Sequence, residues 1–99
     1  MRAMPTYISL VNWTERGMQE LKESPARADA TAELVQSMGG SMQLYWTVGL
    51  YDIVAIFEAP DDETAAAMQL TVGSRGAVRT TTLRAFGREE FERVIAKVR

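Results

Sequence analysis

The sequence predicts an α+β fold in which the elements follow the order strand, helix, strand, strand, helix, strand, with one further helix at the C-terminus. Segments that alternate apolar and polar residues, as strands do, begin near residues 6, 41, 52 and 77. Segments with apolar residues three or four apart, as in helices, separate the first strand from the second and the third from the fourth. The two middle strands follow one another almost directly, which predicts an antiparallel hairpin.

The first half of the chain is a strand followed by helix. Residues 6–13 carry β-branched and aromatic side chains on both faces of the expected strand. Thr14 is a suitable N-cap for a short helix. Ser24 is predicted to cap a longer, alanine-rich helix with Pro25 at its first position, because proline lacks only a donor that is unpaired there. Gly39 and its glycine neighbour predict the end of that helix.

The central hairpin is predicted from two strands, residues 41–48 and 52–58, joined by a tight turn at Gly49-Leu50-Tyr51-Asp52. Gly49 can adopt a backbone conformation that other residues avoid, and the carboxylate of Asp52 can accept bonds from nearby amides. The run from Ile53 to Phe57 is apolar on both faces, which suits a central strand.

The second half repeats the pattern. Asp61 is predicted to cap a helix with a buried stripe, and a threonine-rich strand follows at residues 77–86. Residues 88–99 have apolar side chains at helical spacing and predict an amphipathic helix. The predicted stripe of the first of these helices consists of Ala65, Met68 and Val72, and that of the second of Phe91, Val94, Ile95 and Val98.

This order is the ferredoxin-like arrangement, with both crossover helices on one face of a four-stranded antiparallel sheet. The strands nevertheless carry apolar residues on both faces, so we expect something to cover the second face. The simplest cover is the same sheet of another copy. We therefore expect a homodimer packed sheet to sheet, or a higher homo-oligomer.

Composition limits the possible partners and locations. The 99 residues suit one domain, residues 1–99. The net charge of −2 and the scattered lysines and arginines argue against nucleic acid as a partner. The longest apolar run, Ile53 to Phe57, is far too short to cross a membrane, and residues 1–5 do not form a signal-peptide core. A cytoplasmic protein with no membrane association is the expectation.

The chain contains no cysteine and no histidine, which removes thiolate nucleophiles, imidazole bases and the commonest transition-metal ligands. The consecutive carboxylates Asp61, Asp62 and Glu63 would point to different sides of a helix, and they suit its positive N-terminus better than a metal ion. We therefore predict no metal site and no cofactor.

Three segments resemble the GYD-domain family, which is named after the glycine-x-tyrosine-aspartate turn. They are Gly49-Leu50-Tyr51-Asp52-Ile53-Val54, Glu58-Ala59-Pro60-Asp61-Asp62, and the strand from Gly76 to Phe86. The opening strand, the Ser24-Pro25-Ala26-Arg27 step and Tyr45-Trp46-Thr47 agree with the family as well. The resemblance implies a dimeric α/β barrel, in which two ferredoxin-like sheets close on one another. It supplies no catalytic residues.

Candidate ligand-binding residues come from three groups. Tyr51 and Asp52 would place a phenol beside a carboxylate at the mouth of a cavity between the sheets. Arg79 and Thr82 offer a cation and a hydroxyl for an anionic group. The aromatic set that could line an apolar pocket consists of Tyr7, Tyr45, Trp13 and Trp46.

Each group also has a structural interpretation, which we favour. In this interpretation the Tyr51 and Asp52 turn simply locks a hairpin, and the aromatic residues belong to a core or a dimer interface. Arg79 would pair with a carboxylate such as Asp52 or Glu58 across the sheet. Arg27 could anchor an anion, but an exposed arginine at a helix start is the interpretation that we prefer.

Three functions remain open. The first is a ligand-binding or assembly domain without catalysis, which the absence of a nucleophile favours. The second is a cofactor-free barrel enzyme, similar to a monooxygenase or isomerase, acting on a small aromatic or carbonyl compound. The third is a scaffold whose sheet edges pair into rings.

Overall fold

The computed structural model describes residues 4–99, and Met1, Arg2 and Ala3, part of the segment assessed above as a signal peptide, lie outside the described residues. The elements of the described chain are β1 (Thr6–Trp13), α1 (Glu15–Gln19), the 3-10 helix η1 (Leu21–Glu23), α2 (Ser24–Ser37), β2 (Ser41–Trp46), β3 (Ile53–Glu58), α3 (Asp62–Ser74), β4 (Val78–Ala85) and α4 (Arg88–Ile95). This is the predicted order of strands and helices.

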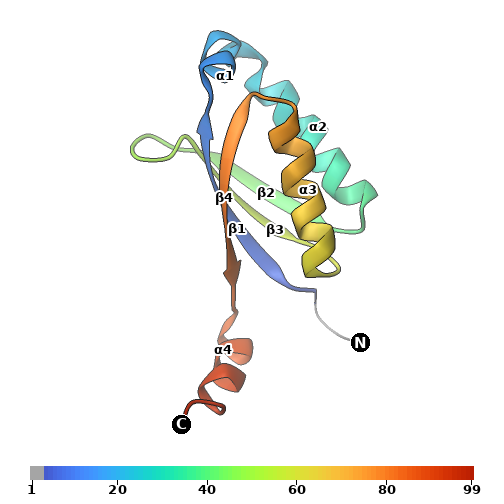
Figure 1. The fold of residues 1–99 in the computed structure, drawn as a ribbon, viewed down its shortest axis with the longest axis vertical. Coiled ribbons are helices and arrows are strands. Elements are labelled where there is room, and N and C mark those ends of the chain that lie inside the picture. The colour runs from blue at the N-terminus through green and yellow to red at the C-terminus, as the bar shows by residue number, and fades with distance from the viewer. Residues whose placement is uncertain (1–3) are drawn as a thin grey trace.

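The four strands form one antiparallel sheet in the order β2-β3-β1-β4. Strand β1 lies in the middle, with Tyr7 opposite Phe57 of β3 and opposite Arg84 of β4. Helices α2 and α3 lie on the same face of this sheet (Figure 1). The ferredoxin-like fold predicted from the sequence is therefore confirmed.

The core lies between the sheet and these two helices. Tyr7 and Phe57 stack with their ring centroids 5.1 Å apart, and Met68 of α3 is almost completely buried beside them. The predicted α3 stripe is confirmed, since Ala65 and Met68 are buried and Val72 lines the same side. Apolar burial of this kind is the main favourable term in the folding of a small domain.

Two predicted helix caps are confirmed. The Thr14 hydroxyl accepts a bond from the Gly17 amide, and the Asp61 carboxylate accepts one from the Thr64 amide. Each cap satisfies a backbone donor that has no partner within its helix. The Asp61 bonds to Thr64 also hold the pKa of that carboxyl below its usual range.

The prediction that Ser24 is an N-cap is wrong. Ser24 is the first residue of α2, with helical dihedral angles, and its amide donates to the carbonyl of Leu21. The 3-10 helix runs directly into α2, so no extended residue separates them. The Ser24 hydroxyl instead accepts a bond from the indole nitrogen of Trp46 at 3.0 Å, which ties α2 to β2.

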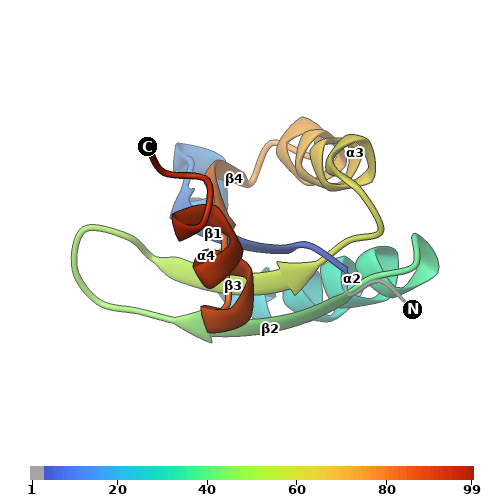
Figure 2. The same cartoon turned by 90° about the horizontal axis from the view of Figure 1, so that it is seen from below.

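The predicted tight turn is also wrong, because β2 ends at Trp46 and a loop over residues 47–52 follows. The Thr47 amide donates to the Asp52 carbonyl, and the chain then leaves the sheet. Gly49 has a φ of 137°, so the expected need for glycine is confirmed. The loop projects beyond the end of the β2–β3 hairpin (Figure 2).

The C-terminal helix is shorter than predicted and lies beyond the sheet. Helix α4 ends at Ile95 rather than at residue 99, and it hangs from the end of β4 (Figure 1). Phe91 and Ile95 are about half exposed, so its apolar side packs little against this chain. A helix of two turns is only marginally stable alone.

Candidate functional site

The first candidate site is the face of the sheet opposite the helices, which we call the open face. Alternation along the strands places one set of side chains here, and no helix of the described chain covers them. Ile56 is 37% exposed and Leu83 46% exposed. The apolar side chains of the open face are Ile8, Leu10, Val54, Ile56, Leu83 and Tyr45.

Asp52 joins the hairpin to β1 at one end of the open face. Its Oδ2 atom accepts a bond from the Trp13 amide at 2.9 Å and contacts the Asn12 amide group at 3.5 Å. The Asn12 side chain also donates to the carbonyl of Leu50 at 3.0 Å. The carboxylate therefore holds the loop against the end of β1, which is the structural role that the sequence analysis favoured.

Arg79 lies next to this network without the expected ion pair. Its neighbour across β1 is Asn12, and within residues 4–99 no carboxylate lies within salt-bridge distance of it. The expected pairing of Arg79 with Asp52 or Glu58 is therefore wrong. For Glu58 the reason is register, because Glu58 pairs with Thr6, at the other end of the sheet.

Tyr7 lies on the helix face of β1, and its hydroxyl donates to the Asp62 carboxylate at the start of α3. Burial and this bond raise the pKa of Tyr7 to about 12. The Arg84 guanidinium lies 5.7 Å from the Tyr7 ring centroid and pairs with Glu90. A phenol with a raised pKa keeps its proton at neutral pH, which disfavours Tyr7 as a general base.

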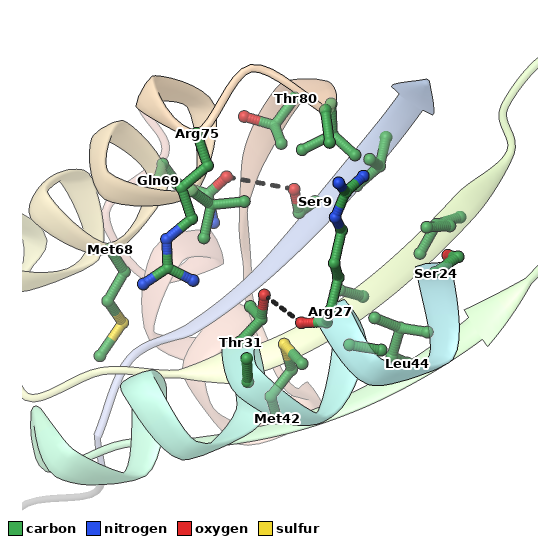
Figure 3. A pocket seen from close by; sticks show the side chains of 18 of the residues that line it. Ser9, Ser24, Arg27, Thr31, Met42, Leu44, Met68, Gln69, Arg75 and Thr80 are labelled. Carbon is green, nitrogen blue, oxygen red and sulfur yellow. Dashed lines mark hydrogen bonds between the residues drawn. The ribbon is translucent and has the colours of Figure 1, made fainter. Parts of the chain in front are cut away.

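The second candidate site is a cavity of about 140 Å³ between the sheet and helices α2 and α3 (Figure 3). Its walls are mainly apolar, because the helices present small residues such as Ala28 while the sheet presents Val11 and Ala55. The one buried polar residue of the sheet here is Ser9, whose hydroxyl lies 3.2 Å from Oε1 of Gln69. We call this space the helix-face cavity.

Two arginines border the helix-face cavity. Arg27 extends from α2 and Arg75 from the end of α3, and both side chains lie in the space between the helices (Figure 3). Arg27 binds the Glu20 carboxylate at 2.9 Å, and Arg16 binds the same oxygen at 3.1 Å. These bonds hold the pKa of Glu20 below its usual range.

The six predicted ligand residues do not meet in one cavity. Asp52, Arg79 and Tyr45 belong to the open face, but Tyr45 lies on the β2 edge and Arg79 on the β4 edge. Tyr51 lies in the loop, where its carbonyl accepts a bond from the Thr47 hydroxyl. Tyr7 belongs to the helix face, and so does Thr82, which pairs with Ser9. Of the six, only Asp52 and Arg79 share a neighbour, Asn12.

Sequence reasoning missed the polar residues of the helix-face cavity, Ser9, Gln69 and Arg75. One signal was present: Ser9 interrupts the inward-facing positions of β1 between Tyr7 and Val11. A small polar residue at such a position leaves room and a hydroxyl in the core.

Within residues 4–99, no group of three or more acidic side chains is arranged to hold a metal ion. Over the same part of the chain, no helix combines the length and apolar character that crossing a membrane requires.

An antiparallel four-stranded sheet with both helices on one face defines a ferredoxin-like α+β protein. The chain belongs to the GYD-domain family, whose model matches residues 7–95. The resemblance drawn from the sequence is thus confirmed.

Two proteins of Thermus thermophilus are similar to this chain. One is the "Glutamine synthetase and cystathionine beta-lyase binding protein", which is 38% identical over 84 residues, covering 83% of this chain and 88% of that protein. The other is the crystal structure of TTHA0845, with a TM-score of 0.56 and 26% identity over 85% of this chain and 95% of that one.

Proposed function

We propose that this protein is a non-catalytic binding protein, a single domain over residues 1–99 that works in the cytoplasm as a homodimer. The two copies pack open face to open face and together form an α/β barrel. Each copy leaves its helices and its loop, residues 47–52, available to a partner protein.

The observation that carries the proposal is the apolar centre of the open face. Ile8, Val54 and Ile56 lie on neighbouring central strands, and no helix of residues 4–99 covers them. The charged residues Arg79 and Glu58 lie toward opposite ends of this face. An apolar centre with a polar rim is typical of protein interfaces. A two-fold axis lets such a patch cover its own copy.

The loop supports the second part of the proposal. Val48 is fully exposed, and Leu50 is 82% exposed in the same loop. Two neighbouring apolar side chains on a projecting loop are suited to contact another protein. The name of the Thermus thermophilus relative points to enzymes of amino-acid metabolism as the class of partner.

Dimerisation is tested with Ile56→Lys, which places a charge in the centre of the open face. We expect the wild-type protein to have the mass of a dimer by light scattering and the variant that of a folded monomer. Leu70→Lys is the matched control, because Leu70 is 74% exposed on α3 and lies away from the open face. A monomeric wild-type protein, or an unchanged mass in Ile56→Lys, contradicts the interface.

Partner binding is tested with the glutamine synthetase and the cystathionine β-lyase of the same organism. We expect saturable binding of at least one of them by calorimetry, and a loss of that binding in the double variant Val48→Ser with Leu50→Ser. The dimer mass should not change in this variant. Failure of the wild-type protein to bind either enzyme refutes this class of partner without affecting the test of the dimer.

A further inference from the structure

We infer that the helix-face cavity binds a small carboxylate, with an apolar body the size of one aromatic ring in the chamber and the carboxylate at Arg75. This inference goes beyond the proposed function, because it concerns a small molecule and the opposite face of the sheet. The dimer and this site can therefore be tested separately.

The volume and lining define the body of the ligand. The cavity has a volume of about 140 Å³. An engineered apolar cavity of about 150 Å³ accommodates benzene, so one ring or a short branched chain fits. Val11, Ala55 and Phe57 from the sheet and Val72 from α3 offer mainly aliphatic and aromatic surface. Ligand pockets typically combine such walls with a few polar groups.

Two polar groups inside the chamber can orient a ligand. Ser9 is 2% exposed and donates to Oε1 of Gln69, which leaves the Gln69 amide nitrogen without a hydrogen-bond partner among the described residues. Thr80 lines the chamber next to them, and its hydroxyl likewise makes no hydrogen bond within residues 4–99. Both groups could bond a polar substituent on the body of the ligand.

The charges at the mouth favour an anion. Arg16 and Arg27 share the single carboxylate of Glu20. Arg16 also donates to the backbone carbonyl of Arg75, which keeps the three arginines together. The guanidinium of Arg75 has no ion pair or hydrogen bond within residues 4–99, so the mouth has an excess of positive charge.

A carboxylate suits this mouth better than a phosphate dianion. Arg75 is one cation without a carboxylate partner among the described residues, and its planar guanidinium can donate two parallel hydrogen bonds to the two oxygens of a carboxylate. Arg27 lies on the other side of the same space and already uses one nitrogen on Glu20 (Figure 3). A dianion would bring more negative charge than Arg75 alone can balance.

The test uses benzoate as the probe, followed by the backbone amide signals of the isotope-labelled protein in NMR. We expect saturable shifts around Ser9, Gln69 and Thr80. Benzamide, which has the same shape without the charge, should bind at least about tenfold more weakly, because hydrogen bonds to charged groups contribute more than neutral ones. Acetate and inorganic phosphate, which lack the ring, should bind more weakly still.

Three variants locate the site. Arg75→Gln should weaken benzoate binding by about 10- to 100-fold. Ala28→Leu should abolish binding by filling the chamber. Arg88→Gln removes an equal charge from α4, far from the cavity, and should change nothing. Circular dichroism checks that each variant is folded.

Several results would overturn the inference. These are an absence of saturable shifts, shifts centred on the open face, equal binding of benzoate and benzamide, or equal affinity in Arg75→Gln and Arg88→Gln. Phosphate binding as tight as that of benzoate also overturns it, since it would mean an anion site without a chamber.

Discussion

Gly49 has a backbone conformation that side chains with a Cβ atom rarely adopt, with φ at 137°. No other atom lies within 4 Å of the position that a Cβ atom would take there, so the cost of Gly49→Ala would come from the backbone alone. We expect this variant to lower the free energy of unfolding by about 1–3 kcal/mol in urea denaturation.

The matched control is Gly73→Ala. Gly73 lies in α3, also without a neighbour within 4 Å, but its φ is not positive. Alanine should stabilise the helix there by about 0.5–1 kcal/mol. If both variants shift stability in the same direction, the strain assigned to Gly49 is refuted.

Tyr7 makes stability depend on pH in the alkaline range. Its pKa is about 12 in the folded chain against 10.0 in its ordinary state, so the unfolded chain loses the phenolic proton first as pH rises. The stabilising contribution is complete below pH 10 and is lost between pH 10 and pH 12. Tyr7→Phe should therefore flatten this part of the stability profile.

The control for this measurement is Tyr45→Phe. Tyr45 is 56% exposed on the open face, and removal of its hydroxyl should leave the alkaline slope as in the wild-type protein. Thermal unfolding followed by circular dichroism at several pH values measures both. A profile of Tyr7→Phe that matches the wild-type profile rules out Tyr7 as the source of the slope.

At the level of elements, α3 and α4 differ in how their apolar stripes are used. Met68 of α3 is 1% exposed, whereas Phe91 of α4 is 51% exposed. Met68→Ala should cost about 2–5 kcal/mol of unfolding free energy, because it leaves a cavity. Phe91→Ala should change it by no more than about 0.5 kcal/mol, as for other surface positions.

Urea denaturation at low protein concentration, where single chains predominate, measures this difference. A large cost for Phe91→Ala there would show that α4 packs against its own chain.

The sequence could predict both helices but only one of their environments. The stripe of Ala65, Met68 and Val72 and the stripe of α4 both repeat at helical spacing. Spacing reports which side of a helix is apolar, but it does not report what the helix meets. The ends of elements escaped prediction for a related reason, since Ser24 has the chemistry of a cap and yet bonds Trp46 from another element.

At the level of the whole molecule, the proposed dimer couples stability to protein concentration. A chain that folds and associates gains stability from mass action, so its thermal midpoint should rise with concentration. Ile56→Lys should have a midpoint that does not depend on concentration. Differential scanning calorimetry over a wide concentration range measures this, and a constant wild-type midpoint would speak against association.

The order of strands and helices, the two apolar faces of the sheet and the family were determined by the sequence alone. These follow from local periodicity, caps and glycines such as Gly39, and from the motif at Gly49 to Asp52. Only the tertiary structure decided which residues meet. The strand register separates Arg79 from Glu58, and the small side chains of α2 and α3 leave the chamber at Ser9. Contacts between residues distant in sequence depend on register and side-chain volume across elements, and no local pattern encodes these.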